Sequence, residues 1–201
     1  MNAASHVAVI LAAGGSRRLG RSKQLLTAEG ETLVARAARM ASATGAAATY
    51  VITGAGHDTV RDALAGSDAK VVYNPAWPTG MAGSLLVASQ VLAGSAAPVL
   101  VLAVDHPGLG VSHLVTLLGT HALDPSRDVA TGYADTFGIP AVLRASMFAR
   151  AGELVGDRGF KSLWASPEHR PNVVSAPALL DDLDTPEDLD RAIAAGLLDD
   201  K

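Results

Sequence analysis

Short, almost continuous runs of Val, Ile, Leu and Ala alternate along the first part of the chain with longer segments that are apolar at helical spacing. The runs are typical of strands covered on both faces of a parallel sheet, and the longer segments predict crossover helices between them. We expect strands at residues 6–12, 49–53, 70–74 and 98–104. We expect helices at residues 32–45, 57–66, 81–94 and 111–123.

After about residue 128 the pattern loosens. Strands are expected at residues 128–134, 139–145 and 172–176, and helices at 145–156, 160–166 and 185–196. Thr185 is the expected N-cap of the last helix, with Pro186 at its first position and Asp188 as the reciprocal cap. The order of elements predicts an α/β fold with a parallel sheet and right-handed crossovers, in one domain over residues 1–201.

Composition narrows the classes of protein that fit this pattern. The chain of 201 residues is 49% hydrophobic but only 4% aromatic, which predicts an aliphatic core. It has no cysteine, so disulfides, thiolate metal sites and cysteine nucleophiles are excluded, and a reducing cytoplasm is expected. A net charge of −4 argues against general nucleic-acid binding. The apolar run near the N-terminus lacks a basic leader, so we expect neither a signal peptide nor a membrane span.

The polar residues of interest follow the expected strands. In open α/β sheets, ligands bind beyond the carboxyl ends of the strands. A glycine-rich loop follows the first strand there, and the stretch from residue 11 to residue 23, LAAGGSRRLGRSK, carries Arg17, Arg18, Arg21 and Lys23. Four cations on one loop of a net negative protein predict a local site for a small anionic ligand.

Two phosphate-binding motifs fit this loop poorly. A P-loop would place Arg21 where G-x-x-x-x-G-K-[ST] has lysine, and arginine is a poor substitute for that compact charge. A dinucleotide-binding loop needs G-x-G-x-x-G, but Gly14 and Gly15 are adjacent, and the second strand ends without an acidic residue for a ribose. Both interpretations are disfavoured.

The same loop, read as L-A-A-G-x-S-x-R-[LM]-G-x-x-K, resembles the signature of the sugar-nucleotide-type nucleotidyltransferases. Within the molybdopterin nucleotidyltransferases it is most similar to the molybdenum cofactor cytidylyltransferase group. Further motifs of that group follow in order at residues 74–85, 104–107, 138–140, 156–159 and 182–188. The resemblance covers essentially the whole chain. It implies a three-layer α/β/α sandwich with a mostly parallel, Rossmann-like sheet of the nucleotide-diphospho-sugar transferase (GT-A-like) type.

The resemblance also implies a reaction. Enzymes of this group use Mg²⁺ to move CMP from CTP to the terminal phosphate of molybdenum-bound molybdopterin, release pyrophosphate and hand the product over to a molybdoenzyme. LAAG in place of LAGG, and GMAGSL in place of a GPLAG-type stretch, resemble the cytidylyl branch more than the guanylyl branch. Four alternatives stay open: GTP as the donor, a sugar or polyol phosphate as the acceptor, a non-catalytic domain that binds and delivers the cofactor, and a redox role.

Residue roles follow from the motif positions. The implied catalytic residues are Lys23, Arg18 and Asp105, with Arg18 clamping the phosphates and Lys23 at the α-phosphate. Backbone N–H groups of the glycine loop can approach phosphate closely. Arg17 and Arg21 fall at variable positions and are interpreted as solvated surface charges. The implied nucleotide-binding residues are Leu11, Ala12, Ala13, Gly14, Gly15, Ser16, Arg18, Lys23, Asn74, Gly80 and Ser84.

Acidic residues are the implied metal ligands. Asp105, at the tip of an apolar strand, is the expected first ligand, and Asp184 the second, with Asp182 as its close competitor. Acidic side chains just before a helix N-terminus interact favourably with the helix dipole. A purely structural role for Asp182 and Asp184 therefore stays open. His106 departs from the expected Gln or Met, which leaves the acceptor's identity open.

The later motifs resemble the acceptor side of the pocket. The implied acceptor-binding residues are Gly138, Pro140, Asp157 and Gly159. Phe137 and Phe160 flank them and would contact a flat ligand or pack in the core. Trp77 and Met81 are expected to pack, although an exposed aromatic could face a pterin.

Overall fold

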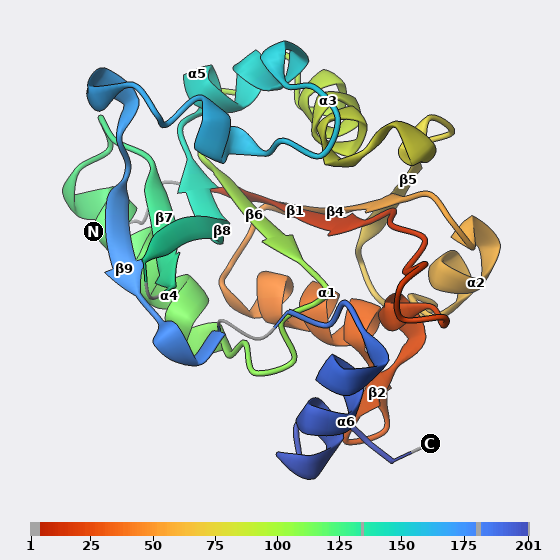
Figure 1. Ribbon diagram of the computed structural model, residues 1–201. Coiled ribbons are helices and arrows are strands. Elements are labelled where there is room, and N and C mark those ends of the chain that lie inside the picture. Colours follow the sequence, from red (N-terminus) through yellow and green to blue (C-terminus); the bar gives the residue numbers. More distant parts are fainter. Residues whose placement is uncertain (1–4, 134, 180–181, 201) are drawn as a thin grey trace.

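The computed structural model describes residues 5–133, 135–179 and 182–200 (Figure 1). Within these residues, one seven-stranded sheet has the order β5-β4-β1-β6-β8-β7-β9. Only β8 of this described sheet runs antiparallel to its neighbours, so the mostly parallel sheet is confirmed. The strands are β1 (Val7–Ala12), β4 (Ala48–Thr53), β5 (Lys70–Tyr73), β6 (Val99–Ala103), β7 (Val129–Tyr133), β8 (Thr136–Leu143) and β9 (Asn172–Ser175).

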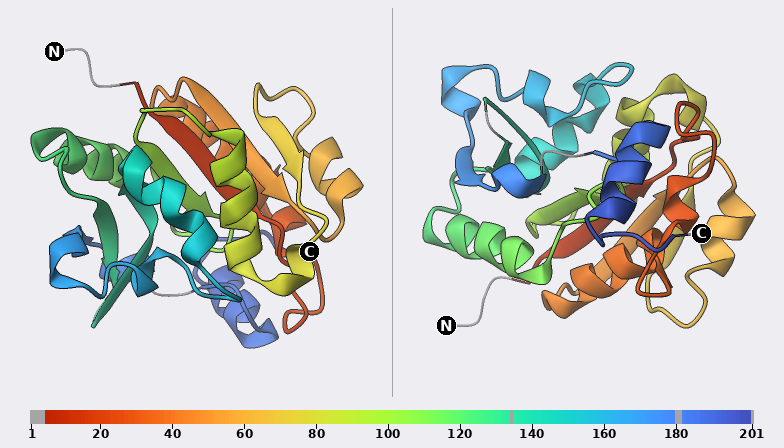
Figure 2. Two further views of the ribbon diagram at one scale, coloured as in Figure 1. Left: turned by 90° about the horizontal axis from the view of Figure 1, so that it is seen from above. Right: turned by 60° about the horizontal axis from the view of Figure 1, so that its bottom comes forward.

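Helices cover both faces of the sheet (Figures 1 and 2). On one face lie α1 (Leu33–Ala43), α2 (His57–Asp62) and α4 (Val111–Leu123); on the other lie α3 (Met81–Val91) and α5 (Ala145–Phe148). Side chains of β1 alternate between the two layers: Ile10 is buried in the core cluster that includes α1, and Val9 in the cluster that includes α3. The three-layer sandwich is therefore confirmed. No helix in the described part of the chain is long and apolar enough to cross a membrane.

Several expected elements differ in extent. The helix expected at 57–66 ends at Asp62 and continues as turns, while the one expected at 145–156 divides into α5 and a 3-10 helix. The strand expected at 139–145 begins at Thr136, because a hairpin with β7 pairs its polar start. The 3-10 helices are η1 (Lys23–Leu25), η2 (Trp77–Thr79), η3 (Ala149–Glu153), η4 (Phe160–Ser162), η5 (Pro167–His169) and η6 (Pro177–Leu179).

A few expectations extend past the described residues. Residue 134, the last of the strand expected at 128–134, lies outside them, as do residues 1–4, 180–181 and 201 of the expected single domain.

The C-terminal helix α6 (Pro186–Ala194) packs on a small hairpin that the hydrophobic pattern did not predict, formed by β2 (Thr27–Ala28) and β3 (Glu31–Thr32). The expected capping box is confirmed: the Thr185 hydroxyl accepts from the Asp188 N–H at 3.3 Å, and the Asp188 carboxylate accepts from the Thr185 N–H at 2.7 Å. The backbone N–H of Leu183 donates to the carbonyl oxygen of Asp105 at 3.0 Å. This contact holds the segment before α6 against the end of β6.

Candidate functional site

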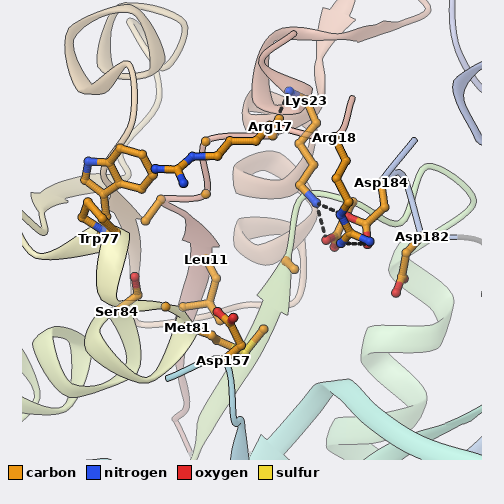
Figure 3. A pocket seen from close by; sticks show the side chains of 18 residues that line it. Leu11, Arg17, Arg18, Lys23, Trp77, Met81, Ser84, Asp157, Asp182 and Asp184 are labelled. Atoms are coloured by element: carbon orange, nitrogen blue, oxygen red, sulfur yellow. Dashed lines mark hydrogen bonds and ion pairs between the residues drawn. The ribbon is translucent and has the colours of Figure 1, made fainter. Parts of the chain in front are cut away.

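A cleft of about 480 Å³ opens at the carboxyl ends of β1 and β6, between the glycine loop and the segment before α6 (Figure 3). Trp77 and Ser84 lie on one side of it, and Lys23, Arg18 and Asp184 lie on the other (Figure 3). The predicted site residues that line the cleft are Leu11, Ala13, Gly14, Gly15, Ser16, Arg18, Lys23, Gly80, Ser84, Asp105, Asp157 and Asp184. The structure therefore brings most of the predicted residues to one place.

Two predicted nucleotide-binding residues lie behind the cleft wall. Ala12 is buried, and its carbonyl oxygen accepts from the Gln24 side chain at 3.0 Å. Asn74 is also buried; its amide nitrogen donates to the Ser84 hydroxyl at 3.1 Å, and its amide oxygen accepts from the N–H of Ala76 at 3.0 Å. Asn74 therefore positions Ser84 and the start of the following turn and does not itself reach the cleft.

The predicted acceptor-binding residues divide in the same way. Asp157 lines the cleft, but Gly138, Pro140 and Gly159 do not. Gly138 and Pro140 lie within β8, where Gly138 pairs with Thr131 of β7. Phe160, the neighbour of Gly159, is buried in the core, as its packing alternative predicted.

Gln24 holds the glycine loop in shape, and its role was not predicted from the sequence. Its side-chain nitrogen donates to the carbonyl oxygens of Ala12, at 3.0 Å, and Gly14, at 2.7 Å. The Ser16 hydroxyl accepts from the N–H of Lys23 at 3.2 Å, which closes the loop on itself. A lone glutamine in a polar loop gives no sequence signal for this role, because its partners are backbone carbonyls.

Lys23 lies between two predicted metal ligands. Its Nζ is 2.8 Å from Asp105 Oδ2, 3.3 Å from Asp184 Oδ1 and 3.3 Å from the carbonyl oxygen of Leu183 (Figure 3). Burial acts to lower the pKa of Lys23, but the two carboxylates outweigh it and hold the pKa above its ordinary value. Arg18 Nη2 pairs with Asp184 Oδ2 at 2.8 Å, so both oxygens of Asp184 contact cations.

Asp105 and His106 form a second cluster with the exposed Asp182. The three side chains offer ligand atoms that lie within 4.8 Å of one another. Burial acts to raise the pKa of Asp105, but His106 and Lys23 outweigh it and hold the pKa well below its usual range. Burial raises the pKa of Asp182, and the Asp105 and Asp184 carboxylates act in the same direction against His106. The group can hold a divalent cation, with His106 as the member that was not predicted.

Trp77 and Arg17 form the opposite wall. The Arg17 guanidinium carbon is 5.8 Å from the centre of the Trp77 ring, so this exposed cation stacks on an aromatic face. Glycines permit the close approach of the indole, because a Cβ at Gly54 would lie 2.5 Å from Trp77 Cβ. A Cβ at Gly15 would lie 3.0 Å from Trp77 Cζ3. Arg17 was expected to be a solvated surface charge, but its side chain also lines the cleft.

Gly80 allows the segment with Asp157 to close on the start of α3. Its φ of +105° lies in the region that favours glycine, and an added Cβ would lie 2.5 Å from the backbone of Gly156 and 2.7 Å from Asp157 Oδ1. The N–H of Ala82 donates to the Gly156 carbonyl oxygen at 2.9 Å. Gly80 therefore fixes where Asp157 enters the cleft.

Gly80→Ala is expected to destabilise the fold by about 3 kcal/mol, because the strained φ and the clash with Gly156 each cost roughly 1–3 kcal/mol. The melting temperature should then fall by roughly 10 °C for a chain of this length. Gly119→Ala in α4 is the matched control, because its added Cβ meets nothing within 4 Å. It should gain up to about 1 kcal/mol. Equal melting temperatures for Gly80→Ala and the unmodified protein would contradict the close packing.

Known proteins are similar to this chain in sequence and in fold. A family model described as "MobA-like NTP transferase domain" matches residues 8–172. Nicotine blue oxidoreductase of Paenarthrobacter nicotinovorans is 35% identical over 159 residues, which is 79% of this chain and 74% of that protein. The crystal structure of Rv0371c from Mycobacterium tuberculosis has a TM-score of 0.79 at 27% identity, covering 94% of this chain and 98% of that one. A complex of Rv0371c with manganese has also been solved. A nucleotidyl transferase from Methanothermobacter has a TM-score of 0.80 at 24% identity, covering 96% and 98%, and shows the same fold.

Proposed function

Because this chain belongs to the MobA-like NTP transferase family and is a nucleotidyltransferase, we propose that it moves CMP from CTP to the terminal phosphate of molybdenum-bound molybdopterin and releases pyrophosphate. The observation that carries the proposal is the juxtaposition of Lys23 with Asp105 at the mouth of the glycine loop. The choice of CTP rests on LAAG and GMAGSL, which resemble the cytidylyl branch. The product would pass to a molybdoenzyme.

The chain's own residues would bind and orient the triphosphate. Glycines at the mouth of the cleft let backbone N–H groups come close to phosphate oxygens. Arg18 has a 72% exposed side chain, so its guanidinium can leave Asp184 and clamp a phosphate. Lys23 has three acceptors around Nζ and only three protons, so a phosphate oxygen must replace one of them. Its fixed ammonium would stabilise the charge that develops at the α-phosphate.

A divalent cation fits the acidic side of the cleft. Asp105 Oδ1 is buried without a hydrogen-bond partner, which is the state of an oxygen available to a cation. Asp105 would hold the ion, with Asp184 or Asp182 as the second carboxylate, and Mg²⁺ is the ion that the family resemblance implies. When bound, such an ion supplies charge that neutralises the phosphates.

The acceptor would approach from the side of Asp157. This carboxylate lines the cleft beside Gly80 and Met81, across from Lys23 (Figure 3). Gly138, Pro140 and Gly159 would shape this side from behind the wall. An in-line attack on the α-phosphate needs the acceptor and the leaving pyrophosphate on opposite sides of it, and the cleft between Lys23 and Asp157 offers such an arrangement.

A thermal-shift screen tests the proposal. CTP, GTP, UTP and ATP would each be added with a divalent cation, and CTP should raise the melting temperature most. A nucleotide at a hundred times its dissociation constant stabilises by about 2.7 kcal/mol. Pyrophosphate release would then be followed with CTP and molybdopterin-bound molybdenum, and with sugar and polyol phosphates in its place. Pyrophosphate release with GTP but not with CTP would overturn the proposal of CTP as the donor. Pyrophosphate release only with a sugar phosphate would overturn the proposal of molybdopterin-bound molybdenum as the acceptor.

Trp77 should report nucleotide binding through its fluorescence. The chain has two tryptophans, and Trp164 is buried in the core with its indole N–H bonded to Asp128 at 2.8 Å. Both members of the Arg17–Trp77 pair line the cleft, so a nucleotide there would contact them. Emission should therefore change with CTP in the unmodified protein and stay constant in Trp77→Phe. An undiminished change in Trp77→Phe would place the nucleotide elsewhere.

A redox activity is a second candidate, favoured by the identity with Nicotine blue oxidoreductase. The cleft would then bind a donor of reducing equivalents in place of the triphosphate. Purified protein would be incubated with NADH or NADPH and a quinone-type dye, and the loss of nicotinamide absorbance measured. Dye reduction that depends on the cleft would favour this candidate, and its absence alongside pyrophosphate release would exclude it.

A further inference from the structure

We propose that His106 is a metal ligand, and that Asp105 and His106 together form a nitrogen and oxygen site that prefers a transition-metal dication to Mg²⁺. The inference rests on the proposed function, because Asp105 lines the same cleft. His106 directly follows Asp105 beyond the end of β6, and its side chain is only 6% exposed. A buried imidazole at this position is unlike the Gln or Met that the family resemblance led us to expect.

Hydrogen bonding fixes which nitrogen of His106 faces which neighbour. His106 Nε2 lies 3.1 Å from Asp182 Oδ1 and 3.3 Å from the Tyr133 hydroxyl oxygen. The Tyr133 hydroxyl donates its own proton to the carbonyl oxygen of Ile139, so toward His106 it acts as an acceptor. Both neighbours of Nε2 are therefore acceptors, and Nε2 is the nitrogen that donates to them. Nδ1 is left on the side of Asp105, where it can serve as a metal ligand.

Nδ1 of His106 faces an oxygen of Asp105. His106 Nδ1 and Asp105 Oδ1 are 3.2 Å apart, but they are not aligned as a hydrogen bond, and both atoms are buried without a hydrogen-bond partner. The other oxygen of Asp105 is already paired with Lys23 at 2.8 Å. A divalent cation bound by Nδ1 and Oδ1 would satisfy both atoms, and the cleft that Asp105 lines gives a metal ion access.

The donor set determines which cation fits. Mg²⁺ prefers oxygen ligands, whereas imidazole nitrogen suits Zn²⁺, Fe²⁺, Ni²⁺ and related ions. The Asp182 carboxylate on Nε2 fixes the ring and makes Nδ1 a better donor, as carboxylates do for many metal-bound histidines. Asp182 is thus a positioning residue, and Asp184 is the carboxylate that becomes available as a further ligand when Arg18 leaves it for a phosphate.

Mn²⁺ is the probe that tests the proposal without relying on turnover. Chelator-treated protein would be titrated with Mn²⁺ and followed by electron paramagnetic resonance, with and without inorganic pyrophosphate, which contains no nitrogen. We expect nitrogen hyperfine coupling from the imidazole, and Mn²⁺ binding at least about tenfold tighter than Mg²⁺ binding, since even the hydrogen-bond partners of metal ligands change affinity by 10–100-fold.

Two variants complete the test. His106→Gln should lose the nitrogen coupling and bring the Mn²⁺ and Mg²⁺ affinities together. His113→Gln removes the neighbouring imidazole, which bonds Thr131 at 2.8 Å, and should keep both properties. The unmodified protein is decisive even where His106→Gln folds poorly. The proposal is overturned when its Mn²⁺ signal lacks nitrogen coupling, when the coupling survives in His106→Gln, or when Mg²⁺ binds as tightly as Mn²⁺.

The outcome is separable from that of the proposed function. Pyrophosphate release with Mg²⁺ and no nitrogen coupling would overturn the role of His106 and leave nucleotidyl transfer standing. Nitrogen coupling without turnover of any nucleoside triphosphate would overturn nucleotidyl transfer and leave the role of His106 standing.

Discussion

Lys23→Ala is expected to lower kcat/KM for nucleotidyl transfer by about a thousandfold, measured as pyrophosphate release at saturating acceptor. Removing one charged or polar group aimed at the developing charge of a transition state costs about 10²–10³ in rate. Lys23 is also firmly held, with three acceptors around Nζ and a side chain 14% exposed. Its loss should therefore act on kcat and not only on nucleotide affinity.

Lys23→Arg is expected to recover little of this rate. The planar guanidinium cannot replace a compact ammonium enclosed by Asp105, Asp184 and the Leu183 carbonyl oxygen. Arg21→Ala, an exposed cation at a variable position of the same loop, is the matched control and should stay within about twofold of the unmodified protein. Melting temperatures of the variants separate lost chemistry from lost folding. A Lys23→Ala enzyme with near-normal kcat would exclude this lysine from the reaction.

Asp105→Asn should have an effect of similar size, with cation-dependent turnover falling by at least about a thousandfold. A bound metal contributes several kcal/mol of charge stabilisation, and each 1.36 kcal/mol is tenfold in rate. The amide keeps the shape of the side chain but removes the charge that holds both Lys23 and a cation. Turnover should be measured across a range of divalent-cation concentrations, because a weakened site would need more metal.

Asp157→Asn is the appropriate comparison for Asp105→Asn. Both are carboxylates that line the cleft, but Asp157 lies away from Lys23, on the side proposed for the acceptor (Figure 3). It should change the KM for the acceptor and leave the dependence on divalent cation unaltered. If Asp105→Asn retained full cation-dependent turnover, the metal would bind elsewhere and the assignment of this carboxylate would be wrong.

Local features were the ones that the sequence predicted well. The capping box of Thr185 and Asp188 involves residues three apart, and the apolar runs of β1 and β6 reflect burial on both faces. Such signals are contained within a few neighbouring residues. The family resemblance added most of the residues that line the cleft.

Features that depend on distant partners were not predictable. β8 runs antiparallel because it forms a hairpin with β7. The residues of β8 alone do not indicate whether the strand runs parallel or antiparallel to its neighbours. Gln24 holds the loop through backbone carbonyls, and the exposed Arg17 stacks on Trp77, which comes from another loop. The orientation of the His106 ring depends on Tyr133 and Asp182, which lie far along the chain. Each of these follows from tertiary contacts.

The contact between the segment before α6 and the end of β6 has a consequence for the order of assembly. Lys23 and Asp184 are 161 positions apart, so the site joins one of the first loops to one of the last segments of the chain. During synthesis, the strands from β1 to β8 leave the ribosome while Asp182 and Asp184 are still inside it. A partly made chain then has the glycine loop and Asp105 but lacks the carboxylates that balance Arg18 and hold His106. The charge cluster can therefore close only after the segment before α6 has been made.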